Sequence, residues 1–234
     1  MFAEHLEKLR HGGPWLPWRT LLLATAAVAA YLLLGAAPEN WVFDRAAITR
    51  GEWWRLLSGH WVHSGAAHAG WDIGALLLLG FLFEKTLGRH LVSVLLLGSL
   101  GIDAWIWWGE PSLGYYCGLS GILNTLMAVG LVSLWQEMRH PLIALTGLGF
   151  VAKVLIELSG GQMLLTSTAW PGVPEVHAVG MFVGMLYTGT QLLTCRWNMR
   201  NESSDPGRDA DRFLPGAGGK RTCAGCHTGI PGVR

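Results

Sequence analysis

Charged residues are scarce in this sequence. Asp, Glu, Lys and Arg supply 14% of its 234 residues, whereas a soluble domain normally contains about a quarter. The basic and acidic side chains nearly cancel to a formal net charge of +1, so we expect no nucleic-acid partner. Hydrophobic residues make up 51% of the chain, and tryptophan (13) and glycine (32) are abundant. This composition and the long apolar runs exclude an ordinary soluble core and predict an all-α membrane protein.

Cysteine is also rare, and its four positions do not form a disulfide framework. Cys117 and Cys195 lie in or beside apolar segments, whereas Cys223 and Cys226 lie in a polar tail. The tail stretch CAGCH, which ends at His227, matches the C-x-x-C-H haem-attachment pattern, and a weak metal site is a second alternative. Two thiols and one imidazole leave a tetrahedral zinc site one ligand short. We therefore read the tail as unstructured and expect no cofactor and no metal.

Apolar stretches long enough to cross about 30 Å of hydrocarbon recur along the chain. The sequence predicts a six-transmembrane-helix bundle over 20–195, after a cytoplasmic leader over 1–19 and before a flexible, polar, Gly/Pro-rich cytoplasmic tail over 196–234. Glycines within the spans favour close helix contact. The six predicted spans are 20–37, 66–83, 91–108, 117–135, 141–158 and 176–194.

The distribution of Lys and Arg predicts the orientation of the bundle. Basic residues occur in the leader and after the second, fourth and sixth spans, whereas the third-to-fourth and fifth-to-sixth connections contain none. Both termini are therefore predicted to be cytoplasmic. The first connection, 38–65, is predicted to lie outside although it contains three arginines, Arg45, Arg50 and Arg55. Because it is also rich in tryptophan, we expect it to lie in the membrane interface with its arginines reaching the headgroups.

Polar residues gather where three of the spans begin. His68 and Asp72, four residues apart on one helical face, begin the second span together with His63. Ser120 begins the fourth span, and His177 begins the sixth. In the alternating topology these three positions share one depth on the external side. The chemistry that this indicates is acyl transfer by a serine nucleophile with an imidazole base and a backbone N–H as oxyanion donor.

Structural readings of the same residues stay open. A serine between Gly118 and Gly121 fits helix packing, and His63 fits either a site wall or a structural hydrogen bond. Three ionisable residues inside the spans are read as structural: Asp103 as a helix–helix hydrogen bond, and Lys153 with Glu157 as an i, i+4 pair whose charges cancel. We expect His60 to lie in the membrane interface.

These motifs resemble the rhomboid family of intramembrane serine proteases. Gly118-Leu119-Ser120-Gly121 matches its GxSG motif, and His177 with Gly180 and Gly184 matches the base of its final helix. His63, His68 and Asp72 match its His-x4-His-x3-Asn element, with Asp in place of Asn. The stretches GEWWRLLSGHWVH and CGLSG are most similar to the rhombosortase branch, which is associated with bacterial proteins that carry a C-terminal GlyGly sorting tail.

The resemblance implies a role for each matching residue. Ser120 is the expected nucleophile and His177 the general base, a dyad without an acidic third member. His68 and the Ser120 N–H are expected to line the oxyanion hole, and Asn124 to supply an amide donor near it. Asp72 accepts hydrogen bonds when ionised but cannot donate to an oxyanion, so it either stays protonated or orients His68.

The resemblance also implies the function. The expected protein is a serine endopeptidase of the bacterial inner membrane that opens to the outer face and cleaves membrane-anchored substrates, those with C-terminal GlyGly-type sorting tails among them. Its expected partners are the lipid bilayer and that protein substrate. One alternative is a non-catalytic rhomboid-like protein that binds client transmembrane helices, which Asp72 favours. Another is an electron-transfer protein that uses the tail's C-x-x-C-H.

Overall fold

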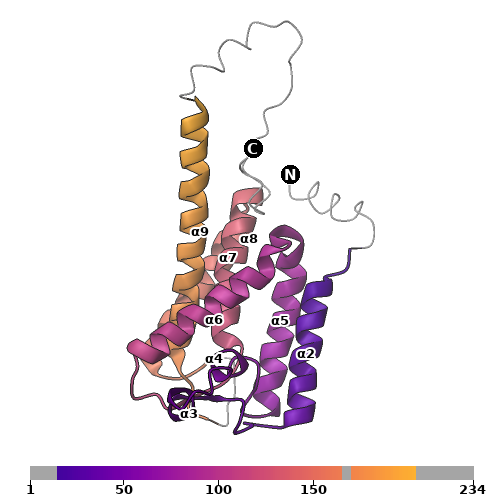
Figure 1. The fold of residues 1–234 in the computed structure, drawn as a ribbon. Helices are drawn as coiled ribbons and strands as arrows, with labels where there is room; N and C mark the ends of the chain where they lie inside the picture. Colours follow the sequence, from indigo (N-terminus) through magenta and orange to yellow (C-terminus); the bar gives the residue numbers. More distant parts are fainter. Residues whose placement is uncertain (1–14, 165–169, 204–234) are drawn as a thin grey trace, which may run out of the picture.

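The computed structural model describes residues 15–164 and 170–203. This part of the chain is mostly helical (Figure 1), with one short two-stranded sheet. In chain order the elements are α2 (Trp18–Leu34), β1 (Phe43–Asp44), α3 (Arg45–Thr49), α4 (Arg55–Ser58), α5 (Ala66–Leu87), α6 (His90–Trp108), β2 (Tyr115–Tyr116), α7 (Ser120–Met138), α8 (Pro141–Gly160) and α9 (Pro174–Ser203).

Helices occupy all six ranges predicted as spans, but not all of them have the length and composition of a span. Four described helices do: α5, α6, α8 and the Pro174–Thr194 part of α9. The apolar α2 is shorter, at 17 residues, and α7 is not among the four. Eleven of the 19 residues of α7 are buried against other parts of the protein, so its sequence need not be uniformly apolar. The structure therefore confirms a multi-pass membrane protein without confirming the count of six.

Glycines bring α9 into backbone contact with α7. A Cβ atom on Gly180 would lie 2.0 Å from the carbonyl oxygen of Gly121. One turn further along, a Cβ on Gly184 would lie 2.7 Å from the carbonyl oxygen of Thr125. Such an approach is possible only for residues without side chains. Because His177 precedes Gly180 by three residues, it lies on the same face of α9, beside the beginning of α7.

The pairing of α2 with α5 also depends on a glycine and a buried acid. A Cβ on Gly80 would lie 2.1 Å from Oγ1 of Thr20. The Glu84 carboxylate accepts hydrogen bonds from the backbone N–H of Thr20 at 2.8 Å and from that of Arg19 at 3.1 Å. These are free N–H groups in the first turn of α2, so an anion there satisfies them. The contact fixes the position of α5.

The connection before α5 is folded onto the connection before α7. Strand β1 pairs antiparallel with β2, with Phe43 opposite Tyr116. The Arg45 side chain donates to backbone carbonyls at and after the C-terminal end of α6, including that of Trp107 at 3.2 Å. The Arg55 side chain is buried and donates to the carbonyl of Val42 at 3.0 Å. The prediction that these two arginines reach the lipid headgroups is therefore wrong, because the side chains of both bind backbone carbonyls of the protein.

The last described helix is longer than the sixth predicted span. It continues to Ser203, past the boundary at 196 where the tail was expected to begin. The C-x-x-C-H stretch at 223–227 lies outside the described residues.

Candidate functional site

Ser120 is the first residue of α7 and is 9% exposed. The loop that leads into it is held by two backbone hydrogen bonds: the Gly118 N–H donates to the Gly59 carbonyl at 3.0 Å, and the Leu119 N–H donates to Asp72 at 2.7 Å. The N–H groups of the first helical turn have no acceptor within their own helix and carry the positive end of the helix dipole. Ser120 therefore combines a hydroxyl with a backbone N–H that has no acceptor within its own helix.

Asp72 lies among three nitrogen atoms. Its Oδ2 accepts from the Leu119 N–H and lies 3.3 Å from Nε2 of both His63 and His68. Ser64 lies on the other side of His68, with its backbone nitrogen 3.4 Å and its hydroxyl 3.0 Å from Nδ1. A backbone N–H can only donate, so Nδ1 is an acceptor and the proton of a neutral His68 is on Nε2, facing Asp72. An acceptor-only carboxylate fits this position.

Any side chain at position 118 would collide with His68 and press on Asp72. The φ of Gly118 is +118°, which L-residues rarely adopt. A Cβ at this position would lie 2.5 Å from Nε2 of His68 and 3.1 Å from Oδ2 of Asp72. The glycine therefore allows the loop before Ser120 to lie directly against the His68 ring.

His177 is 2% exposed and has different partners on its two ring nitrogens. Nδ1 lies 2.7 Å from Oε2 of Glu157 and 3.0 Å from Nζ of Lys153. Lys153 and Glu157 also form the expected i, i+4 ion pair at 2.9 Å. Nε2 is buried and has no hydrogen-bond partner among the residues that the structure describes. The imidazole is thus anchored through one nitrogen only.

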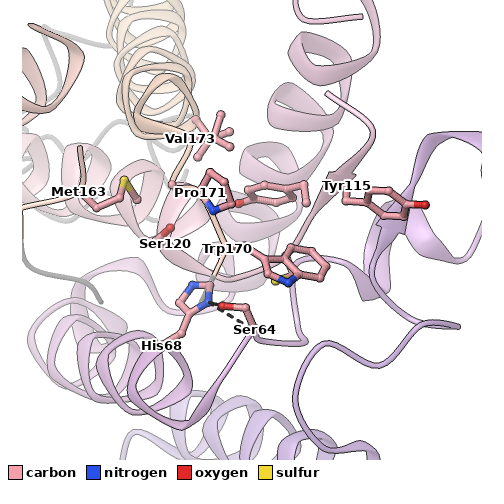
Figure 2. Close-up of a pocket in the computed structure, with 12 residues that line it drawn as sticks. Ser64, His68, Tyr115, Ser120, Met163, Trp170, Pro171 and Val173 are labelled. Carbon is pink, nitrogen blue, oxygen red and sulfur yellow. Dashed lines mark hydrogen bonds between the residues drawn. The ribbon is translucent and has the colours of Figure 1, made fainter. Parts of the chain in front are cut away.

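A pocket opens beside Ser120 (Figure 2). Ser120, His68 and Ser64 line it together with Trp170 and Pro171, which belong to the segment before α9. His177 is not among the lining residues, although its neighbour Val176 is. The pocket gives a ligand access to the Ser120 hydroxyl and leaves the His177 imidazole shielded from it. The other lining residues are Tyr115, Tyr116, Cys117, Met163, Gly172 and Val173.

Two buried side chains, Tyr116 and His60, support the loop before Ser120. The Tyr116 hydroxyl donates to the Gly118 carbonyl at 3.0 Å, and burial, with a smaller contribution from the negative charge of Asp72, raises the pKa of this phenol well above its usual value. The His60 ring packs edge-on against Tyr116, and its Nε2 lies 3.1 Å from Oδ1 of Asp103. His60 is 1% exposed, so its expected interfacial position is wrong: Asp103 holds it inside the protein.

Asn124 is buried one turn after Ser120. Its Nδ2 donates to the Ser120 carbonyl at 2.7 Å, within α7. In this structure the amide is thus bonded to its own helix.

The structure brings the predicted residues to one end of the bundle and adds one that the sequence did not relate to them. Ser120 with His68, Asp72 and His63 forms one group, and His177 lies on the α9 face that contacts α7. The sequence predicts that Glu157 pairs with Lys153 alone, yet the Glu157 carboxylate also contacts His177. The available signal was an acid in an otherwise apolar span, but no sequence spacing relates it to His177. Among the described residues, no group of three or more His, Cys, Asp or Glu side chains is arranged to hold a metal ion.

Comparison with known proteins identifies the family of this chain. The Rhomboid domain family matches residues 50–193. Over 121 residues the chain is 30% identical to Rhomboid protease GluP of Bacillus subtilis (strain 168). That alignment covers 50% of this chain and 23% of GluP. Over 176 residues it is 24% identical to RHOMBOID-like protein 4 of Arabidopsis thaliana. That alignment covers 73% of this chain and 42% of the Arabidopsis protein. The match thus spans less than half the length of either relative. Since the family matches more than half of the sequence, this chain belongs to the rhomboid family.

Proposed function

We propose that this protein is an intramembrane serine endopeptidase with Ser120 as nucleophile and His177 as general base. The observation that carries the proposal is the glycine contact between α7 and α9. Because Gly180 lies against the Gly121 carbonyl, it brings His177 to the end of α7 where Ser120 begins. The Nε2 of His177 is the ring nitrogen without a described partner, which leaves it to accept the serine proton.

The proposed reaction follows from these positions. Oγ of Ser120 attacks the carbonyl carbon of the scissile peptide while Nε2 of His177 takes its proton. The same proton then passes to the leaving amine, and water hydrolyses the acyl-enzyme by the reverse transfers. The Ser120 N–H is the proposed donor to the oxyanion, and His68 lines the site with its Nε2–H facing Asp72 at 3.3 Å. Asp72 acts as an acceptor that orients His68 and holds the Leu119 N–H.

The proposed substrates are membrane-anchored proteins, and by resemblance to the rhombosortase branch they carry C-terminal GlyGly-type tails. A peptide must leave its helix to reach Ser120, and small residues make that unwinding easier. We propose that six helices cross the bacterial inner membrane with both termini in the cytoplasm, so that the pocket opens to the outer face. The pairing of β1 with β2, and the presence of Trp170 in the pocket, support a common side for the three connections involved.

Cleavage by the reconstituted protein tests the proposal. Wild-type protein in proteoliposomes is expected to cleave a tagged single-span substrate with a GlyGly tail, and Ser120→Ala and His177→Ala are each expected to abolish the product. Ser133→Ala is the matched control, because this buried serine of α7 only donates to the Val129 carbonyl of its own helix.

Three results of that assay have distinct meanings. Cleavage by Ser120→Ala at the wild-type rate would contradict the proposed nucleophile. Equal cleavage of a substrate whose GlyGly is replaced by ValVal would contradict the tail specificity alone. Retention of uncut substrate by wild-type protein would favour the alternative in which the protein binds client helices without cleaving them.

A further inference from the structure

Glu157 is buried on α8, a helix whose other residues mostly face outward. Of the 20 residues of α8, only Val154 and Glu157 are buried. The Glu157 side chain is 1% exposed, and it is directed at His177 of α9 rather than at the surface. An ionised group within a membrane span is costly unless it has partners or a purpose. The position of Glu157 therefore calls for an explanation beyond the cancellation of the Lys153 charge.

The geometry determines which nitrogen of His177 carries the proton. A carboxylate oxygen cannot donate, so a bare Nδ1 at 2.7 Å from Oε2 of Glu157 would place two lone pairs against each other. Lys153 lies 3.0 Å from the same Nδ1 and has Glu157 as its own acceptor at 2.9 Å, so the shorter contact between Nδ1 and the carboxylate decides the tautomer. The neutral imidazole is therefore protonated on Nδ1, and the lone pair is on Nε2.

The Glu157 carboxylate is itself held in place. Its Oε1 accepts a hydrogen bond from the Leu164 N–H at 3.0 Å, and its Oε2 is bound by Lys153. Its backbone carbonyl accepts the Gly161 N–H at 2.9 Å, which closes the last turn of α8. A carboxylate fixed at both oxygens presents a single orientation to the His177 ring.

We propose that Glu157 is a positioning residue that, supported by Lys153, holds His177 in the Nδ1–H tautomer and directs Nε2 at the Ser120 proton. This inference rests on the proposed role of His177 as base. It replaces the expected Ser–His dyad with a chain of three groups contributed by α7, α9 and α8. When Nε2 takes the serine proton, the ring becomes an imidazolium and Nδ1–H keeps its bond to Glu157. The negative charge then stabilises the positive ring at the moment it forms.

Kinetics of Glu157→Gln test the inference. The amide keeps the size of the side chain but removes the charge, and its nitrogen can donate to Nδ1 and favour the wrong tautomer. We expect kcat to fall on the order of 10²-fold with KM changed by no more than about threefold. Glu175→Gln is the matched control, since it removes an exposed acid two residues from His177 on α9. A wild-type kcat in Glu157→Gln would overturn the inference.

Nitrogen-15 NMR of histidine-labelled wild-type protein tests the same inference without a variant at Glu157. The His177 signals are identified by their absence in His177→Gln, and we expect a protonated Nδ1 and a bare Nε2. The opposite tautomer would overturn the inference even if Glu157→Gln does not fold. This readout does not depend on catalysis. Loss of the proposed function, seen as Ser120→Ala that still cleaves, is therefore distinguishable from failure of the positioning role.

Discussion

At the scale of single residues, Asp72 shows how a substitution within a family motif is accommodated. The motif on α5 has an amide at this position, which both donates and accepts, whereas a carboxylate only accepts. The surroundings match the carboxylate, because the Leu119 N–H and the two imidazole Nε2 atoms converge on Oδ2. Of the two expectations for Asp72, this geometry supports orientation of His68 over a protonated donor.

Replacing Asp72 tests that account. Asp72→Asn is expected to cleave more slowly than wild type, because a neutral amide oxygen in the place of Oδ2 is a weaker acceptor for the Leu119 N–H and for His68 than a carboxylate. Asp72→Ala is expected to be slower still and less stable, because a buried donor left unpaired costs about 1–3 kcal/mol. Both are measured by cleavage rate and thermal unfolding in detergent, with Glu39→Gln as the exposed-acid control. If Asp72→Asn is as active as wild type or more so, the account in which the site requires an ionised acceptor at this position is wrong.

The sequence predicts Ser120, His177 and Asp72 as site residues because each lies near the beginning of a predicted span and at a position of a family motif. It did not relate Glu157 to His177, because that contact depends on how α8 is rotated about its axis. The Lys153–Glu157 spacing is explained equally well by a pair that points anywhere around the helix. Only the packing of α8 against α9 shows that the pair faces an imidazole.

At the scale of elements, the contact between α7 and α9 places His177 beside the beginning of α7, where the proposed nucleophile lies. A side chain cannot be accommodated at Gly180 by rotation of a neighbour, because the nearest atom is the Gly121 backbone oxygen. Any Cβ there forces the two helices apart. The separation would move His177 away from the beginning of α7 as well as loosen the core.

Gly180→Ala is therefore expected to lose cleavage and about 1–3 kcal/mol of stability, the usual cost of overpacking. Gly189→Ala lies on the same helix with nothing within 4 Å of its Cβ, so it is expected to be neutral or slightly stabilising. Thermal unfolding and cleavage rates of the two variants measure the difference. Equal behaviour of the two alanine variants would show that the α7–α9 contact does not hold the site together.

The long helices were predictable from the sequence, but the connection before α5 was not. Apolar length and flanking charge locate the helices, whereas β1 and β2 have two residues each and show no alternating pattern. The Arg45 side chain binds carbonyls of α6 and of the connection that follows α6, so the sequence around Arg45 does not identify these partners. Charge counting alone therefore misread the role of this arginine in a membrane protein.

At the scale of the whole molecule, the proposed site exists only when four helices are assembled. Helix α5 contributes His68 and Asp72, α7 contributes Ser120, and α9 and α8 contribute His177 and Glu157. The sequence predicted a common depth for three of these segments from the alternation of the spans. Their mutual approach follows from glycine contacts and buried polar bonds, which are properties of the folded chain.

Chemical labelling of Ser120 tests the central claim most directly. A fluorophosphonate reacts with a serine hydroxyl, losing fluoride, only where a base activates that hydroxyl in an assembled site. Peptide mapping by mass spectrometry is expected to locate the adduct on Ser120 of the folded wild-type protein. We expect the adduct to be absent from His177→Gln and from heat-unfolded protein. A folded, cleaving protein without an adduct on Ser120, or an adduct formed equally in His177→Gln, would contradict the account.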